Sequence, residues 1–314
     1  MVGPLLLAPS GAGHAFDLQG HRGARGLAPE NTLAAFAMAL AIGVTTLETD
    51  LAVTKDGVLV LSHDPMLNLD IVRGPDGQWI AEPAPAINSL TLAELKRFDV
   101  GRLKPETKYA RQFPQQRAID GQRIPTLAEL FMLAETSGKL PRFNLETKLA
   151  PDKPEQTPDP ETFARLVVDA VRQAGVAART TVQSFDWRTL LLVKRLAPEI
   201  ETVCLTSPST LRGEGEGAAR RPSPWLAGLD PVMHGGSVPR LAKAAGCGTW
   251  SPWFEELGAD QVAEAHALGL KVIPWTVNAA DNMAQLIDMK IDGLITDYPD
   301  RARVVMAAKG LPLP

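Results

Sequence analysis

The sequence predicts an α/β fold in which eight parallel strands form a (β/α)8 barrel. Short runs with the period of strands alternate with longer runs with the period of helices, which is typical of βαβ units and a parallel sheet. The pair Asp56-Gly57 lies between two strand-like runs and predicts a hairpin turn. The run after this turn should therefore fold back on the run before it and add no parallel strand.

The strand-like segments lie at 17–21, 46–53, 58–63, 142–147, 180–185, 200–205, 247–250, 271–276 and 292–296. The expected helices lie at 32–42, 126–137, 161–174, 187–196, 259–268 and 280–289. The first helix has Asn31 or Thr32 as its N-cap and Gly43 just past its end. With 58–63 assigned to the hairpin, eight parallel strands remain. The alternative is an open doubly wound sheet, but no Gly-rich phosphate loop follows the first strand.

Composition indicates a globular protein with a sizeable core. Of the 314 residues, 45% are hydrophobic and 22% charged, and the net charge of −4 argues against a nucleic-acid partner. No apolar run approaches the roughly 20 residues that span a bilayer. We expect a leader or signal remnant at 1–16, followed by one domain at 17–314. Gly13-His14-Ala15 resembles a signal cleavage site and favours a periplasmic or secreted protein, with a cytoplasmic one as the alternative.

Two segments interrupt the alternation. Residues 65–124 contain many Pro and Gly residues and one expected helix at 91–98, and we interpret them as an insertion beside the mouth of the barrel. A solvated excursion without function is the alternative. Residues 206–246 form the second segment. Cys204 and Cys247 match no zinc spacing. A disulfide between them is an open alternative, but we expect them mainly to be buried small apolar residues.

The alternation within 46–53 is inverted and predicts a cation site. Glu48 and Asp50 share the face that points into the barrel, while apolar residues share the outer face. Two close buried carboxylates repel each other and require a cation or a proton. A surface strand with a solvated acidic face is the alternative. The oxygen ligands would suit Ca²⁺ or Mg²⁺.

Two histidines are expected beside these carboxylates. His21 ends the first strand, and the hairpin should bring His63 back opposite residue 49 or 50. Imidazoles exchange protons near neutral pH. Arg22, between Gly20 and Gly23, offers a planar fork to a phosphate group.

A later strand adds to the same set of side chains. Glu146 and Lys148 share its inward face, so that Glu146 can complete the oxygen-rich site and Lys148 can contact a phosphate oxygen. An ordinary Glu–Lys pair is the alternative. Trp275 would form a wall of the pocket against an apolar or polyol part of the substrate, or else pack in the core. Gln183 and Phe185 pose the same choice.

The order of these residues resembles the glycerophosphodiester phosphodiesterase family. The motifs that carry the resemblance are His21-Arg22-Gly23, Pro29-Glu30-Asn31-Thr32, Glu48-x-Asp50, Lys55-Asp56-Gly57, His63-Asp64, Glu146-x-Lys148, Gln183-Ser184-Phe185, Trp275-Thr276-Val277-Asn278 and Thr296-Asp297-Tyr298-Pro299. The resemblance runs from about residue 17 to residue 300. It implies a distorted TIM barrel, a metal on Glu48, Asp50 and Glu146, phosphate contacts from Arg22 and Lys148, and His21 and His63 as the acid–base pair.

The resemblance also implies an activity. The expected reaction is metal-dependent hydrolysis of a small glycerophosphodiester, such as glycerophosphocholine, to glycerol 3-phosphate and an alcohol. A phospholipase D-like lyase that acts on lysophospholipids and leaves a cyclic phosphate is the alternative. Its apolar entrance would come from Trp225, Leu226 and Leu229. A barrel that only binds phosphorylated polyols is the alternative without catalysis.

Overall fold

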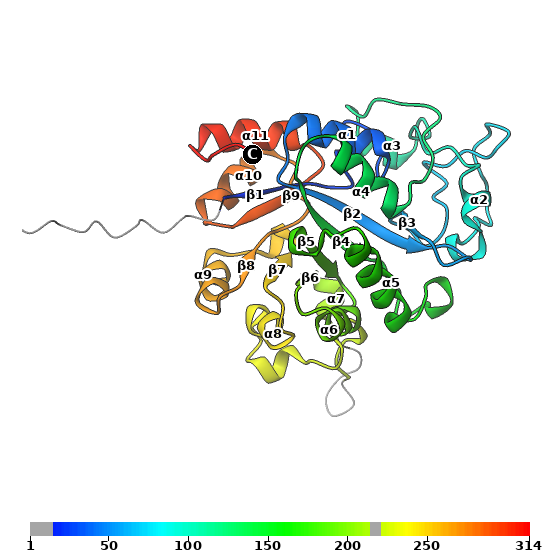
Figure 1. Ribbon diagram of the computed structural model, residues 1–314. Coiled ribbons are helices and arrows are strands. Elements are labelled where there is room, and N and C mark those ends of the chain that lie inside the picture. The colour runs from blue at the N-terminus through cyan, green and yellow to red at the C-terminus, as the bar shows by residue number, and fades with distance from the viewer. Residues whose placement is uncertain (1–14, 214–220) are drawn as a thin grey trace, which may run out of the picture.

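Eight parallel strands and their helices form a nearly closed barrel, as the alternation predicted. The computed structural model describes residues 15–213 and 221–314 (Figure 1). The parallel strands run in the order β8-β7-β6-β5-β4-β2-β1-β9. Their bounds are β1 Asp17–Gly20, β2 Thr46–Val53, β4 Arg142–Thr147, β5 Thr180–Ser184, β6 Glu201–Thr206, β7 Thr249–Pro252, β8 Lys271–Val272 and β9 Gly293–Thr296.

Backbone hydrogen bonds bring the two ends of the sheet together. Asp292 N donates to Val272 O at 2.9 Å, Ile295 N to Pro274 O at 3.0 Å, and Val277 N to Ile295 O at 2.9 Å. Strand β8 ends at Val272, earlier than the predicted strand at 271–276. Pro274 has no N–H group and cannot continue a regular ladder.

The predicted hairpin is confirmed. Strand β3, Leu59–Leu61, pairs antiparallel with β2, and Leu61 lies opposite Leu51. Gly57 occupies the turn with a φ of +78°, a conformation that favours glycine. Ser62 N then donates to Asp50 O at 3.0 Å, so the next residue, His63, emerges beside the carboxylates of β2.

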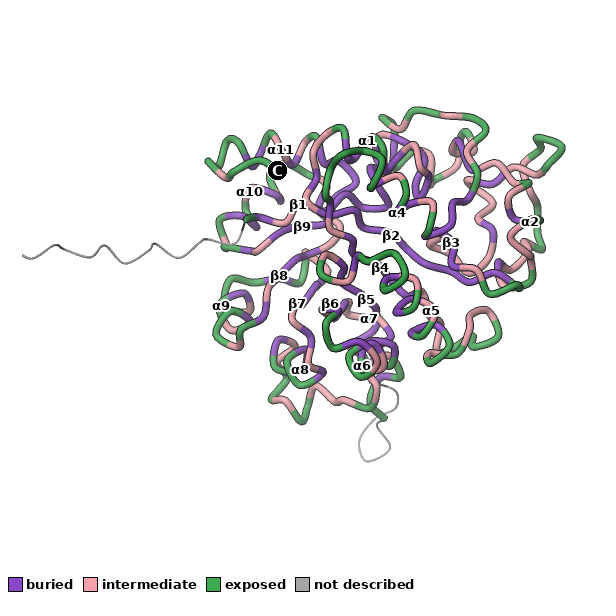
Figure 2. Tube along the Cα trace, in the orientation of Figure 1, coloured by how far each residue is buried: buried purple, intermediate pink, exposed green. Residues whose placement is uncertain are grey.

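Helices cover the outside of the strands. They are α1 Leu33–Ile42, α4 Leu127–Thr136, α5 Pro160–Gln173, α6 Trp187–Leu196, α8 Val238–Ala244, α9 Ala259–Ala267, α10 Ala280–Asp288 and α11 Pro299–Ala308. Helices α8 and α11 were not predicted. The Thr32 hydroxyl caps α1 by accepting from Ala35 N at 3.2 Å, which decides between the two expected N-caps. Figure 2 shows the strands buried and the helices exposed on their outer sides.

The segment 65–124 folds against the hairpin around a small apolar core of its own. That core contains Val60, Leu67, Val72, Ile87, Leu95, Val100 and Ile124. Its short elements are η1 Ile87–Ser89, α2 Leu92–Leu95 and α3 Lys108–Gln112. The helix expected at 91–98 is therefore shorter than predicted. Elsewhere the short helices are η2 Pro154–Gln156, η3 Ala177–Arg179, α7 Pro208–Leu211, η5 Pro224–Leu226, η6 Pro231–His234 and η7 Phe254–Glu256.

Cys204 and Cys247 form a disulfide, which was the less favoured of the two expectations from the sequence. Both residues are buried, and their Cα atoms are 5.9 Å apart. The bond joins Cys204 in β6 to Cys247, which lies two residues before the start of β7. Strand neighbours in the barrel are thus linked covalently as well as by backbone hydrogen bonds.

Reduction of this disulfide should destabilise the fold. The two cysteines are 43 residues apart, and the loss of such a cross-link is expected to cost about 4 kcal/mol of unfolding free energy. Denaturant unfolding with and without a reductant measures the difference. A double Cys204→Ala, Cys247→Ala variant is the control, because a reductant should leave its midpoint unchanged. Equal midpoints for the native protein under both conditions would contradict the expectation.

The leader predicted at 1–16 lies almost wholly outside the described residues, as does most of the Gly-rich stretch near 213–217. Within 15–213 and 221–314, no helix is long and apolar enough to cross a membrane.

Candidate active site

The predicted site residues come from β2, from β4 and from the segments that follow β1, β3, β4 and β8, and they meet around a cavity of about 160 Å³. This is the end of a barrel where the C-termini of parallel strands converge. The cavity is lined by His21, Arg22, Arg25, Glu48, His63, Glu146, Lys148, Gln183, Phe185, Leu205, Trp275, Thr276 and Ile295. Of the predicted site residues, Asp50 alone does not line it.

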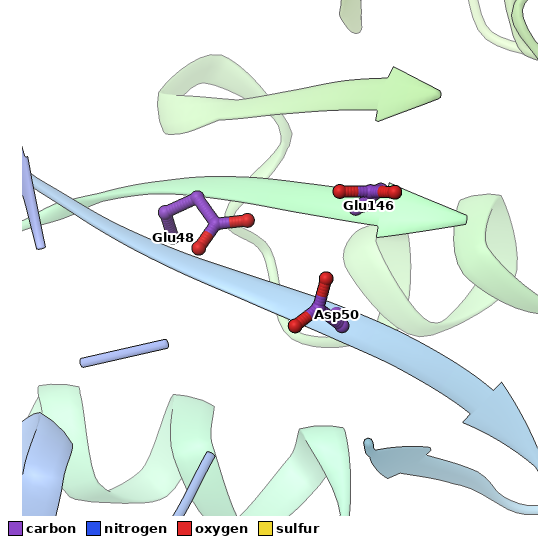
Figure 3. Close-up of side chains that lie close together, drawn as sticks. All are labelled: Glu48, Asp50 and Glu146. Carbon is purple, nitrogen blue, oxygen red and sulfur yellow. The ribbon is translucent and has the colours of Figure 1, made fainter. Parts of the chain in front are cut away.

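Three carboxylates form a compact buried cluster. Glu48 and Asp50 project from β2 and Glu146 from β4, where Asp50 and Glu146 are register partners (Figure 3). One oxygen from each lies within 4.8 Å of the others, and the residues are 1%, 0% and 6% exposed. Burial and the charges of Asp50 and Glu146 raise the pKa of Glu48 well above its usual range. Burial, opposed by Lys148, raises the pKa of Glu146 to about 6.

The cluster fits a hard divalent cation. Asp50 Oδ1 is buried and accepts no hydrogen bond from the described part of the chain. Burial opposes ionisation of Asp50, but Lys148 and Arg22 outweigh it and hold its pKa well below the ordinary value. An ionised carboxylate with an unsatisfied oxygen, beside two more carboxylates, is an oxygen donor set of the kind that Ca²⁺ and Mg²⁺ prefer.

Two cationic side chains lie against the cluster. Arg22 Nε is 3.1 Å from Asp50 Oδ2. Lys148 Nζ is 2.7 Å from Glu146 Oε1 and 3.3 Å from Asp50 Oδ1. The Glu–Lys pair considered as the ordinary alternative thus exists, but it is buried and borders the cavity. The cavity thus combines cationic side chains with a carboxylate cluster. This combination suits an anionic ligand that binds the two cationic side chains and a metal ion held by the carboxylates.

Both histidines are oriented by carboxylates. His21 Nδ1 lies 2.7 Å from Asp297 Oδ1, and His21 Nε2 lies 4.0 Å from Glu48 Oε2. His63 Nδ1 lies 2.8 Å from Asp64 Oδ1, and Asn68 Nδ2 donates to the other oxygen of Asp64 at 2.7 Å. With each Nδ1–H donated to a carboxylate, Nε2 of each ring remains to exchange protons.

Burial lowers the pKa values of these histidines. Burial and the Arg25 guanidinium lower the pKa of His21 to about 4. Burial, together with Arg22 and Lys148, also lowers the pKa of His63. Both rings are therefore neutral near pH 7, in the form that accepts a proton. A bound phosphodiester anion would favour the protonated form again, because opposite charges nearby raise the pKa of an imidazole.

The position of Asp297 beside His21 could not be predicted from the sequence. The motif at 296–299 was noted, but no function was assigned to its carboxylate. Asp297 accepts from Arg25 Nε at 2.8 Å and Nη2 at 3.0 Å, and from Asn278 Nδ2 at 2.7 Å, besides its contact with His21. The signal lay in the topology, because the first and last strands of a closed barrel are neighbours.

The motif at 29–32 holds the loop that carries Arg22. Glu30 Oε1 accepts from Arg22 Nη1 at 2.7 Å, and Asn31 Nδ2 donates to Asp50 Oδ2 at 3.0 Å. Gly23 adopts a φ of +87°, and a Cβ atom there would lie 2.7 Å from the backbone of Ala35. A side chain at this position would therefore displace the loop from α1.

An aromatic pair forms one wall of the cavity. Phe185 and Trp275 pack edge to face, with ring centroids 5.3 Å apart. Gln183 Nε2 donates to Glu48 Oε1 at 2.8 Å, which orients that carboxylate. The apolar entrance expected from Trp225, Leu226 and Leu229 is not found: none of the three lines the cavity, and Leu226 is fully buried in the main core.

A (β/α)8 barrel with acid–base groups, cations and a carboxylate cluster gathered at one mouth is typical of enzymes that cleave phosphate esters. Residues 21–301 match the model of the glycerophosphoryl diester phosphodiesterase family. The chain belongs to this family, and it is a phosphoric diester hydrolase.

Named relatives cover most of the chain. A glycerophosphodiester phosphodiesterase of Caldanaerobacter subterraneus subsp. tengcongensis is 27% identical over 284 residues, which are 89% of this chain and 93% of that protein. A putative glycerophosphoryl diester phosphodiesterase from Silicibacter pomeroyi is 35% identical, with a TM-score of 0.83 and 95% of each chain covered. An Oleispira antarctica phosphodiesterase in complex with the product sn-glycerol-3-phosphate has the same fold, at 24% identity and a TM-score of 0.67 over 93% of this chain and 96% of that one.

Proposed function

We propose that this enzyme hydrolyses small glycerophosphodiesters, such as glycerophosphocholine, to sn-glycerol 3-phosphate and a free alcohol with the help of a divalent cation. One observation carries the proposal: a buried carboxylate cluster and the side chains of Arg22 and Lys148 share one cavity with two histidines. The Nδ1 atom of each histidine is hydrogen-bonded to a carboxylate, which leaves Nε2 for proton transfer. The Oleispira relative, which binds sn-glycerol-3-phosphate, supports the choice of product.

Glu48, Asp50 and Glu146 are the proposed ligands of Ca²⁺ or Mg²⁺. A cation bound there would supply Lewis acidity to a phosphoryl oxygen. Arg22 and Lys148 would bind the other anionic oxygens of the phosphate group, because both cationic side chains lie beside the proposed metal ligands. Trp275, with Phe185 against it, would contact the apolar edge of the glycerol or of the alcohol.

His21 and His63 are the proposed acid–base pair. Nε2 of one ring removes a proton from the nucleophile, either water or the free glycerol hydroxyl of the substrate. Nε2 of the other ring protonates the oxygen of the leaving alcohol as its bond to phosphorus breaks. With water as the nucleophile, the hydroxide adds to phosphorus, the bond from phosphorus to the alcohol oxygen breaks, and the proton goes to that oxygen. With the glycerol hydroxyl, a cyclic phosphate forms first and water opens it.

Release of glycerol 3-phosphate from glycerophosphocholine tests this function. The protein is assayed first with EDTA and then with Ca²⁺ or Mg²⁺ added back. Loss of turnover with EDTA and recovery with one cation would support the proposal and identify a working ion. Absence of turnover on every small glycerophosphodiester, with both cations present, would refute it. The lysophospholipid alternative is not favoured, since Trp225, Leu226 and Leu229, which were expected to form its apolar entrance, do not line the cavity.

Asp297→Asn should lower kcat by about 10²-fold or more, because the neutral amide cannot ion-pair with Arg25 or stabilise a protonated His21, and its NH2 group can donate to Nδ1 and favour the other tautomer. Steady-state kinetics measures the loss, and the ¹⁵N shifts of His21 should report a changed tautomer. Asn278→Asp is unsuitable as a control because it adds a charge at the site. Asp292→Asn is the matched control, since Asp292 pairs with His266 and its variant should retain wild-type kcat. A wild-type kcat in Asp297→Asn would show that this carboxylate does not support catalysis.

A further inference from the structure

Helix α3 of the insertion and the segment that follows it contact the loop 21–30, which carries His21 and Arg22. Gln116 Nε2 donates to Arg25 O at 2.7 Å, and Arg117 N donates to Leu27 O at 2.9 Å. The Arg25 guanidinium lies over the Phe113 ring, 4.6 Å from its centroid. The insertion is therefore attached to the loop 21–30 at several points, and it does not merely extend into solvent.

The Tyr109 hydroxyl makes the most direct of these contacts. It donates to Glu30 Oε2, and it accepts from Arg25 Nη1 at 3.3 Å. Its ring packs edge-on against Phe113, with centroids 5.3 Å apart. One hydroxyl of the insertion thus contacts Arg25 directly and Arg22 through Glu30, both on the loop 21–30.

The contacts of the Tyr109 hydroxyl with Glu30 and with Arg25 each lead to a group of the proposed mechanism. On one side Glu30 Oε1 accepts from Arg22 Nη1 at 2.7 Å, and Arg22 lies beside Asp50. On the other side Arg25 pairs with Asp297, which accepts from His21. A buried carboxylate requires a donor at each oxygen, and Tyr109 is the donor that the described chain supplies to Oε2 of Glu30.

Charge supports this arrangement. Burial opposes ionisation of Glu30, yet Arg22, Arg25 and the Tyr109 hydroxyl hold its pKa below the ordinary value. Without the hydroxyl, Glu30 would lose a donor in a site where its side chain is only 6% exposed. The carboxylate could then turn toward another donor and release the Arg22 guanidinium from its orientation.

We propose that Tyr109 is a positioning residue of the active site, through which the insertion 65–124 holds the Arg22 fork and the Arg25–Asp297–His21 chain in place. The inference rests on the proposed function and deepens it. It gives the insertion a role in the assembly of the site, and Tyr109 itself need not touch the substrate.

Tyr109→Phe tests the inference, since it removes the hydroxyl and keeps the ring against Phe113. We expect kcat/KM for glycerophosphocholine to fall about tenfold, the effect of losing one charge-assisted hydrogen bond. Affinity for inorganic phosphate and for glycerol 3-phosphate, measured by calorimetry, should weaken by a similar factor, because Arg22 binds the phosphate in both ligands. A purely structural role would lower the melting temperature and leave the affinity of the folded protein unchanged.

Two further variants complete the design. If Tyr109 acts through Glu30, the double variant Tyr109→Phe, Glu30→Gln should bind phosphate no more weakly than Glu30→Gln alone. Asp120→Asn is the matched control within the insertion. It removes exposed ion pairs to Arg73 and Arg102 without touching the loop 21–30, so its kcat/KM should remain within about twofold of wild type.

The possible outcomes separate this inference from the function on which it rests. Wild-type turnover with unchanged kinetics and phosphate affinity in Tyr109→Phe would overturn the inference and leave the function intact. Additive losses in the double variant would also overturn it. If the wild-type protein hydrolysed no glycerophosphodiester, the function would fail, and phosphate affinity would still decide the inference: equal affinities in the wild type and Tyr109→Phe would refute it.

Discussion

Replacement of either His21 or His63 by alanine is expected to lower kcat for glycerophosphocholine by about 10² to 10⁴-fold, the range that general acid–base catalysis supplies. Each ring has its Nδ1 held by a carboxylate and its Nε2 left for proton transfer. The loss should appear in kcat more than in KM, since neither ring is a proposed ligand of the phosphate oxygens. Steady-state kinetics with saturating divalent cation measures it.

A substrate with an activated leaving group assigns the two roles. A p-nitrophenyl ester of glycerol phosphate expels a phenolate that needs no proton. The variant that lacks the acid should therefore recover most of its rate on this substrate, while the variant that lacks the base should not. His266→Ala is the matched control, because His266 pairs with Asp292 away from the cavity. Near-full turnover on glycerophosphocholine in either His21→Ala or His63→Ala would refute the proposed pair.

Glu146→Gln is expected to abolish the response to a divalent cation and to lower kcat by about 10³-fold, because the change removes one of the three proposed carboxylate ligands from a buried cluster. Thermal unfolding provides a readout that is independent of activity. Ca²⁺ or Mg²⁺ should raise the melting temperature of the wild-type protein, since a ligand of the folded state stabilises it, and should leave the variant unchanged.

The same substitution should not destabilise the protein in EDTA near pH 8. Burial raises the pKa of Glu146, so its ionised form is disfavoured in the folded state. The sign follows directly: a raised carboxyl pKa lowers stability above about pH 6, and the penalty disappears once the pH falls below the unfolded-state value. Glu146→Gln removes this buried charge, and the stability gained above about pH 6 should offset the loss of the ion pair with Lys148. Glu161→Gln, at an exposed position of α5, is the matched control, and it should retain the cation-induced shift. A retained shift in Glu146→Gln would show that the cation binds elsewhere.

Local sequence patterns were sufficient for the centre of the site. The inverted alternation in β2 places Glu48 and Asp50 on one face, and this follows from strand geometry alone. The turn at Gly57 then brings His63 back beside Asp50. Glu146 in β4 and Lys148, one residue past its end, project to the same side for the same geometric reason. These relations involve neighbours along the chain, where strand periodicity and turn type restrict the outcome.

Contacts between distant segments depended on the closed barrel. His21 and Asp297 are 276 residues apart, and they meet because β9 pairs with β1. The sequence left a disulfide between Cys204 and Cys247 as the less favoured alternative, and the packing of β6 and β7 decided in its favour. The position of Tyr109 followed from how the insertion packs on the loop 21–30, and an irregular segment has no periodicity from which such packing can be predicted.

The sequence by itself therefore determined the fold class, the strand that carries the carboxylates and the residues most suited to the chemistry, because each depends on interactions between residues near one another in the chain. Only the tertiary structure decided which carboxylate orients His21 and which hydroxyl of the insertion holds Glu30. Those partners are selected by long-range packing, and the geometry of side chains brought together from remote segments is set when the barrel closes and the insertion docks on it.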